Sequence, residues 1–314
     1  MKKLFISMLA IAALASCAKE ETLVADKGEL IGFNSFVENS TRAAVDPSLN
    51  ASNLKSFNVW GTVGGVAIYN GDEVKGTVGD PDAGDQYIWT CESVKQYWIK
   101  DAVYKFAALK NEGDKTNVTL VNNLPSKVAF DATAANVDLL YAKNYGPDNN
   151  GIVGLASGNA PVNFNFEHLL SKVKFTVKNN STTATGYSFK VVNIDVKGSK
   201  TGTVVLADKT WESKSDADVY DVADITVASG VASEECAQEL LLIPGEFEVT
   251  FDVEYYCSGT LIATHESVTA NKVTFNGGNS YNLVITVKVG EEITFSVEEE
   301  PEWTDGAGDT TLTL

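Results

Sequence analysis

The chain of 314 residues holds 42 Asp and Glu against 24 Lys and Arg, so its formal net charge is −18 at pH 7. Affinity for nucleic acid or for anionic lipid headgroups is built mainly from Lys and Arg, so this balance argues against both as partners. The hydrophobic fraction of 44% is ordinary for a folded protein, and the length suffices for two domains of common size.

Residues 1–16 are typical of a bacterial secretory signal. Lys2 and Lys3 form its positive start, and residues 4–14 form an apolar segment shorter than the roughly 20 residues that a membrane span needs. The signal runs into Leu14-Ala15-Ser16-Cys17, which resembles the lipobox of bacterial lipoproteins. That resemblance implies cleavage before Cys17 and acylation of its sulfur and its new amino group. Several acyl chains anchor a protein stably in a membrane. The alternative is an ordinary signal with a chance cysteine at the cut.

The residues after Cys17 refine this expectation. Lys19-Glu20-Glu21 resembles the surface-export signal of Bacteroidetes lipoproteins, which implies the outer face of the outer membrane. Residues 17–29 lack apolar periodicity and are expected to form a lipid-anchored tether. Because Lys2 and Lys3 leave with the signal, the net charge of the mature chain becomes −20.

The rest of the chain reads as strands. Apolar and polar residues alternate with a period of two, and Gly, Asn and Asp clusters recur between the alternating segments. Strands are expected at 30–37, 57–63, 66–69, 103–109, 172–177, 187–194, 247–255 and 280–287. Helical periodicity is almost absent, and only two short helical turns are expected, at 138–142 and 167–171. This pattern predicts an all-β fold of antiparallel β-sandwiches.

A boundary between two domains is expected in the Asn- and Gly-rich segment 144–160. We expect one β-sandwich over residues 30–162 and a second over 163–314, the second ending in a C-terminal strand or tail.

Few residues suit catalysis or metal binding. His168 and His265 are the only histidines, and no Cys-x-x-Cys pair occurs. Besides Cys17 the cysteines are Cys91, Cys236 and Cys257; the last two either face each other across neighbouring strands or are free thiols. Acidic loops at 80–85 and 216–224 offer oxygen ligands for Ca²⁺ but lack the spacing of a twelve-residue calcium loop. We expect no enzyme, no metal and no cofactor.

Tryptophan offers one further binding chemistry. Aromatic rings can stack on sugars, but tryptophans in strands more often belong to the core. The five tryptophans are Trp60, Trp89, Trp98, Trp211 and Trp303.

Several segments, taken in order, resemble the fimbrillin family of Bacteroidetes pilins and related surface lipoproteins. They are Thr41-Arg42-Ala43 after a first apolar strand, Tyr97-Trp98 before a strand that ends Phe106-Ala107-Ala108, the segment 138–142, and 164–175. The most specific piece is Phe166-Glu167-His168-Leu169-Leu170-Ser171-Lys172-Val173. The resemblance covers nearly the whole mature chain. It implies two tandem transthyretin-like β-sandwich domains that assemble into a fimbrium or form its tip, and a structural role for His168.

The resemblance also implies a maturation step. In this family a protease cuts after an arginine in the loop that follows the first strand, and Arg42, followed by Ala43, matches that position. Loss of strand 30–37, with Ile31, Phe33, Ser35 and Val37 on one face, would leave a groove with unpaired backbone groups. A strand from a neighbouring subunit could fill that groove. The alternative is that Arg42 stays uncut on a linker.

Candidate donor strands lie near the C-terminus. Ile293, Phe295 and Val297 alternate in one segment, and Leu312 and Leu314 would share a face in the last one. The acidic run 298–302, which includes Pro301, is expected to break the sheet between them. The alternative is that this tail closes the sheet of its own domain or is frayed.

Together these expectations describe a surface fimbrial subunit, a pilin or tip adhesin that serves adhesion or biofilm formation. Its partners would be neighbouring subunits, the outer membrane through lipid, and a host protein or glycan receptor. The alternative is a monomeric surface lipoprotein that binds glycans or host ligands without polymerising.

Overall fold

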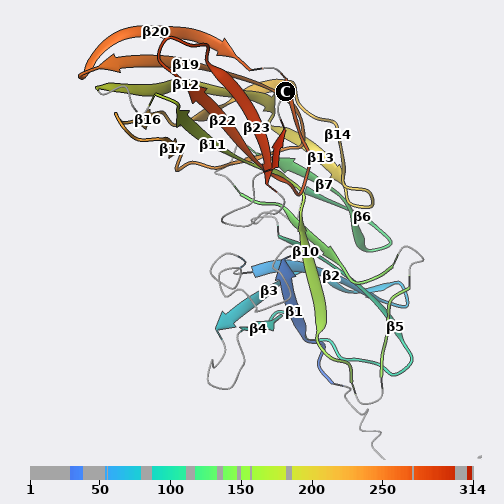
Figure 1. Ribbon diagram of the computed structural model, residues 1–314. Helices are drawn as coiled ribbons and strands as arrows, with labels where there is room; N and C mark the ends of the chain where they lie inside the picture. Colours follow the sequence, from blue (N-terminus) through green and yellow to red (C-terminus); the bar gives the residue numbers. More distant parts are fainter. Residues whose placement is uncertain are drawn as a thin grey trace, which may run out of the picture.

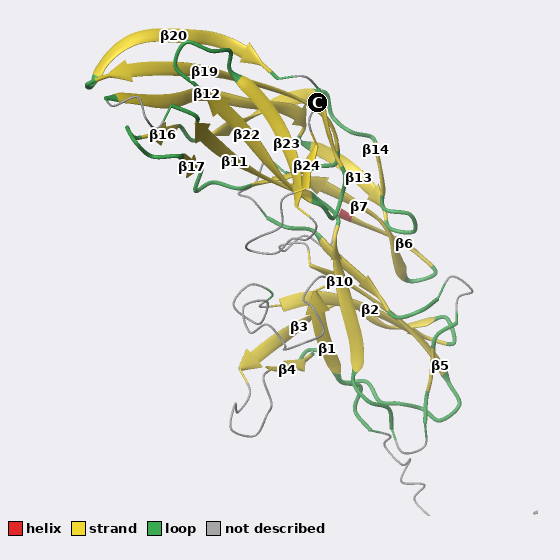
Figure 2. Cartoon of the chain, viewed as in Figure 1, coloured by secondary structure: helices red, strands yellow, loops and turns green. Residues whose placement is uncertain are grey.

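The computed structural model of the protein describes residues 29–37, 54, 56–78, 87–110, 117–132, 137–146, 150–155, 158–181, 186–270, 272–300 and 310–312. The only helical residue among them is Asn117, in a 3₁₀ turn, and their strands confirm the expected all-β fold (Figure 2). The strands gather in two lobes, one mostly from the first half of the chain and one mostly from the second (Figure 1). None of the described residues belongs to a helix with the length and apolar character that a membrane crossing needs.

The first lobe is a sheet that closes on itself. Its strands are β1 (Phe33–Val37), β2 (Ser56–Val63), β3 (Val66–Val78), β4 (Tyr87–Thr90), β5 (Val103–Lys110), β8 (Leu140–Lys143), β9 (Ile152–Val153) and β10 (Val162–His168). They follow the order β2-β3-β4-β1-β10-β8-β5-β9, and β2 also pairs with β5, which makes a barrel-like ring. The sequence predicted a sandwich here. Alternation shows which residues face inward but not which strands pair, so it did not reveal this closure.

Aromatic side chains fill the ring. In β10, Val162, Phe164 and Phe166 are buried while Asn163 and Asn165 are exposed, as expected for a strand with one face on the core. Phe57 of β2 meets the rings of Phe164 and Phe166 edge-on, with ring centres 5.6 and 5.2 Å apart. Burial of these rings is the main force that holds the first lobe together.

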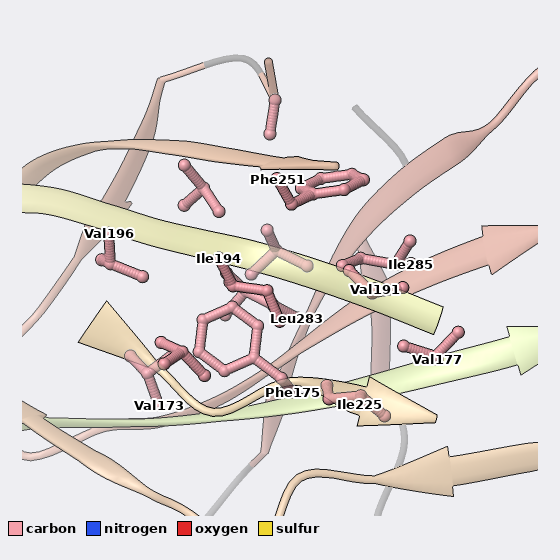
Figure 3. Close-up of a cluster of buried hydrophobic side chains, with 14 of the residues drawn as sticks. Val173, Phe175, Val177, Val191, Ile194, Val196, Ile225, Phe251, Leu283 and Ile285 are labelled. Atoms are coloured by element: carbon pink, nitrogen blue, oxygen red, sulfur yellow. The ribbon is translucent and has the colours of Figure 1, made fainter. Parts of the chain in front are cut away.

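The second lobe contains the predicted β-sandwich. One sheet is built from β11 (Ser171–Asn179), β17 (Ser233–Glu235), β18 (Leu240–Leu242), β22 (Ser280–Val287), β23 (Thr294–Glu300) and β24 (Thr310–Leu312). The other is built from β12 (Tyr187–Ser199), β15 (Ala217–Val222), β16 (Ile225–Val227), β19 (Gly245–Cys257), β20 (Thr260–Thr269) and β21 (Val273–Phe275). Phe175 and Leu283 of the first sheet pack against Ile194 and Phe251 of the second (Figure 3).

Two pairs of the described strands run parallel, although the sequence predicted antiparallel sheets. They are β1 with β10 and β11 with β22. Parallel neighbours cannot be joined by a tight hairpin, and in both pairs about 100 residues or more separate the two strands. Pairing over such distances leaves no local signal in the sequence. The transthyretin-like character of the two domains stays a prediction.

A four-stranded sheet joins the lobes. It has the order β14-β13-β7-β6 and consists of β6 (Val118–Val121), β7 (Leu124–Asp131), β13 (Thr201–Val205) and β14 (Thr210–Glu212). β6 and β7 come before the expected boundary at 162/163, whereas β13 and β14 come after it. The boundary itself falls at the start of β10, which pairs with β1 and β8 in the first lobe.

A separate buried cluster lies at this junction. It joins Trp60 and Tyr141 of the ring to Val128 of β7, Val204 of β13 and Leu170, which lies between β10 and β11. The outer face of the ring is therefore covered at this place. The burial of β2 and β5 on both faces has the same cause.

The two expected helical turns are wrong. Segment 138–142 leads into β8, and segment 167–171 contains the end of β10 and the start of β11. Leu140, Tyr141 and Ala142 are all buried, because the ring core covers one face of β8 and the junction cluster covers the other. A short run of apolar residues does not distinguish a strand buried on both faces from a helical turn.

Candidate functional site: strand β1 and its groove

Strand β1 lies between β10 and β4 in the ring (Figure 1). It pairs with β10 over five residue pairs, from Phe33↔Val162 to Val37↔Phe166. Between the described strands β1 and β4, one pair is formed, Phe33↔Trp89. β1 is therefore held firmly on one side and loosely on the other. Its removal would open the ring between β4 and β10.

Phe33 carries the packing of β1. Its ring stacks on Phe164 with centres 5.9 Å apart and meets Tyr69 and Phe106 edge-on at 5.6 and 6.2 Å. Ile31 is buried as well, and Ser35 is half-buried, which agrees with the expectation that this face points to the core. On the other face, Asn34 Nδ2 donates a hydrogen bond of 3.1 Å to Asn163 Oδ1 of β10.

The segment before β1 is held by backbone hydrogen bonds to the loop after β4. Ile31 N–H donates to the carbonyl of Gln96, and Trp98 N–H donates to the carbonyl of Glu29, at 2.9 and 3.0 Å. A cavity of about 470 Å³ lies beside this segment, between Leu30, Phe33, Trp89 and Val94. The seam between β1 and β4 is thus incompletely filled at its outer end.

The residues expected for lipidation and cleavage lie outside the described residues. These are Cys17, Arg42 and Ala43. Arg42 is the only arginine among the 314 residues, and the other residues in the Lys and Arg count are all lysines. A protease specific for arginine would therefore have one target bond in the chain.

The expected donor residues lie mostly in the sheet of their own lobe. Phe295 pairs with Ile285 and Val297 with Leu283 where β23 joins β22. Phe295 also stacks on Phe251, with ring centres 6.3 Å apart, and Ile293 packs half-buried against the same core. The backbone of Leu312 pairs with Val297, whereas Leu314 lies outside the described residues. The donor role of these residues stays a prediction.

The acidic run was expected to break the sheet, but it does not do so over residues 298–300. Glu298 and Glu299 continue β23 and pair with Asn282 and Tyr281 of β22. Lys178 Nζ lies 3.2 Å from Glu298 Oε1, and Asn279 Nδ2 donates a 2.6 Å hydrogen bond to Glu299 Oε1. These partners compensate for the burial of the carboxylates. Residues 301 and 302 lie outside the described residues.

The histidine of the family motif has the structural role that the resemblance implies. His168 Nδ1 lies 2.6 Å from Asp138 Oδ2, so the ring ties the end of β10 to the segment before β8. The sequence left open whether Cys236 and Cys257 face each other across neighbouring strands or are free thiols. Both are free thiols, as is Cys91.

The tryptophans that the structure describes are mainly core residues. Trp60, Trp89 and Trp98 are 3%, 7% and 2% exposed, too little for a sugar to stack on them. Trp211 is half-buried and its Nε1 donates a 3.2 Å hydrogen bond to the carbonyl of Leu169 at the junction. Trp303 lies outside the described residues.

Comparison with known proteins identifies the family of the chain. The sequence profile of a family described as fimbrillin-like matches residues 41–301. The chain belongs to the fimbrillin-like family. Membership supports a fimbrial or adhesion-related role at the cell surface and association with other fimbrial subunits. No curated protein matches the sequence.

Three solved structures are similar to the chain at low sequence identity. A candidate cell adhesion protein from Bacteroides ovatus is 13% identical, with 89% of this chain and 99% of that chain covered and a TM-score of 0.55. A candidate cell adhesion protein from Bacteroides uniformis is 16% identical, with coverages of 88% and 98% and a TM-score of 0.49. A fimbrial assembly protein from Parabacteroides distasonis is 13% identical, with coverages of 86% and 96% and a TM-score of 0.47. The similarity to the Bacteroides ovatus protein shows that the two chains share a fold, and nothing about function.

The sequence of this fimbrillin-like chain predicted the first strand and a groove beneath it, but not the residues that line the groove. Ile31 and Phe33 were expected on the inner face of the first strand, whereas their neighbours Trp89 and Phe164 were not assigned to it. The alternation of Phe164 and Phe166 was visible, but it did not show that β10 would lie beside β1.

Proposed function

We propose that this fimbrillin-like protein is a fimbrial subunit that loses β1 by cleavage after Arg42 and accepts a strand from a neighbouring subunit in its place. The observation that carries the proposal is the pairing of β1, with five residue pairs to β10 and one to β4. A cut after Arg42 would separate β1 covalently from the other strands of the ring. Backbone pairing and the packing of Ile31 and Phe33 would then be all that retains it.

An emptied β1 position would attract another strand. The groups of β10 that now bond to β1 would be exposed, and the aromatic pocket around Phe33 would be open to water. Such an edge is a template for strand addition, and the pocket gives the incoming side chains a place to bind. Leu312 and Leu314 are the proposed inserting residues.

The C-terminal tail suits the donor role because β24 is short. It pairs with β23 over three residues only, from Val297↔Leu312 to Glu299↔Thr310. Little pairing is lost when it leaves. We propose that β24 and the residues after it form the donor, while Ile293, Phe295 and Val297 stay in their own sheet and hold the tail at its base.

The lipid at Cys17 completes the proposal. The twelve residues from Ala18 to Glu29 span at most roughly 40 Å when extended, so the precursor would be tethered close to the outer membrane. Because the lipid lies before Arg42, the same cut would release the subunit from the membrane. We also propose that the protein is lipidated at Cys17, anchored in the outer membrane and active in biofilm formation.

Digestion with an arginine-specific protease tests the central step. Intact mass should show one cut, after Arg42, and electron microscopy should show filaments after the cut and none before it. Arg42→Lys is the matched variant: it keeps the charge and should resist this protease. A protein that is cut after Arg42 and stays monomeric at high concentration would contradict strand exchange and favour the monomeric binding protein.

A further inference from the structure

A second cavity, distinct from the β1 groove, lies between the two lobes. It has a volume of about 460 Å³, within the range of ligand pockets, and such pockets occur preferentially where domains meet. One wall comes from the ring, through the β2–β3 turn, β5 and β8. The other wall comes from the β6–β7 hairpin and the residues after β13. We call it the interlobe cleft.

Two tight turns close one end of the interlobe cleft. The β2–β3 turn contains Gly64 and Gly65, and the β6–β7 turn contains Asn122 and Asn123, all four with positive φ. Two-residue turns of this kind suit Gly and Asn and are rigid. Asn123 Nδ2 donates a 3.1 Å hydrogen bond to the carbonyl of Gly65, which ties one wall to the other. The cleft is therefore formed before any ligand arrives.

The charge of the interlobe cleft is opposite to that of the chain. Of the residues that the structure describes around it, Lys105 and Lys143 line the cleft and no Asp or Glu does, although the chain as a whole carries a net charge of −18. Among the described residues, neither lysine has a carboxylate partner. Glu167, the carboxylate that acts on Tyr141 beside the cleft, is itself paired with Lys209 at 2.6 Å.

Two tyrosines add a ring surface and hydroxyl groups. Tyr145 is half-buried, and the ammonium group of Lys143 lies 5.6 Å from the centre of its ring. Tyr141 is buried and hydrogen-bonded to Tyr145, and burial raises its pKa far above the ordinary value, so its hydroxyl stays protonated. The cleft thus offers a partly exposed ring with the Lys143 ammonium group beside it, a second lysine in the lining and neutral hydrogen-bonding groups.

We propose that the interlobe cleft binds a carboxylated sugar, such as a uronic or sialic acid residue of a glycan. The two lysines would hold the carboxylate, and the Tyr145 ring would take the face of the sugar. The strands that carry the lysines, β5 and β8, are each paired on both sides and offer a peptide no free backbone edge. This inference goes beyond strand exchange and does not rest on it.

Binding to defined sugars tests the proposal. Purified mature protein is titrated by calorimetry with trigalacturonate and with sialyllactose, each beside a neutral counterpart, galactotriose and lactose. At least one acidic sugar should bind, more weakly as salt rises, and at least tenfold more tightly than its neutral counterpart. Lys105→Ala/Lys143→Ala should lower that affinity at least tenfold.

Three controls make the result specific. Lys75→Ala/Lys100→Ala removes two exposed lysines of the same lobe, each beside a carboxylate, and should leave affinity unchanged. Tyr145→Ala should weaken binding several-fold, whereas Tyr145→Phe should retain most of it. The uncut Arg42→Lys protein should bind like the parent, which separates this site from assembly. Equal thermal melting of all variants shows that they fold.

Several outcomes would overturn the proposal. They are no binding of either acidic sugar at millimolar concentration, equal binding of the neutral counterparts, an unchanged affinity in the double lysine variant, or equal binding of an oligoglutamate. The last result would show capture of charge without recognition of a sugar.

Discussion

Phe33 is the residue on which the proposed exchange depends most. Its ring contacts three aromatic rings from three other strands of the first lobe, and it is 3% exposed. Any strand that replaces β1 has to fill this volume or leave a cavity. The inward residue of the donor at this register is therefore expected to be apolar.

We expect Phe33→Ala to lower the free energy of unfolding of the uncut protein by about 3–5 kcal/mol, because it removes a buried ring and leaves a cavity. Urea unfolding followed by tryptophan fluorescence measures the change. Asn34→Ala, on the opposite face of the same strand, is the control and should cost about 1 kcal/mol or less. Similar costs for both variants would mean that β1 does not plug the core.

At the scale of single strands, the sequence predicted faces better than partners. The alternation in residues 172–177 and 280–287 predicted β11 and β22 and the apolar side chains that they point into the core, because the period of two follows from the local geometry of a strand. The parallel pairing of β11 with β22 joins segments about 100 residues apart and has no local signal. The acidic run was misjudged for the same reason, since Lys178 and Asn279 are distant in sequence.

The retention of β1 after cleavage can be measured directly. At a protein concentration too low for filaments to form, we expect the fragment that ends at Arg42 to remain bound to residues 43–314 during gel filtration, because the pairs to β10 and the buried Phe33 still hold it. A synthetic peptide of residues 303–314 in excess should displace the fragment and take its place. A peptide with Leu312 and Leu314 changed to Asp is the control and should not do so. Immediate loss of the fragment without peptide would show that β1 is held less firmly than its contacts indicate.

Strand β24 should matter little for stability. Deletion of residues 303–314 removes three backbone pairs with β23 and leaves Phe295 and Val297 in place, so we expect the melting temperature to fall by only a few degrees. The truncated protein should nevertheless fail to form filaments after cleavage. A large fall in melting temperature would instead assign the tail a structural role in its own lobe.

At the scale of the molecule, the junction makes the two lobes depend on each other. β7 of the first half pairs with β13 of the second over five residue pairs, and the junction cluster takes side chains from both sides. The sequence predicted a boundary in residues 144–160, but a shared sheet built from two distant hairpins could not be predicted from it.

We expect the whole chain to unfold in a single transition. Trp89 and Trp98 report on the first lobe by fluorescence, and calorimetry reports on both lobes, so the two midpoints should coincide. Leu170→Ala at the junction should lower the common midpoint, because it costs about 2–5 kcal/mol of stability. Leu261→Ala, at an exposed site on β20, is the control and should leave the midpoint unchanged. Two separate transitions would contradict this coupling.

The parallel direction of β1 along β10 has a consequence for the geometry of assembly. β10 runs toward the junction, where Leu169 and Leu170 follow it, so β1 enters at the far end of the first lobe and also points to the junction. An incoming tail that keeps this direction would arrive from beyond that far end, with the body of its own subunit outside. Every addition would then have the same orientation, and the polymer would be polar. One terminus would present an open groove and the other an unused tail, so growth and capping would be chemically different events.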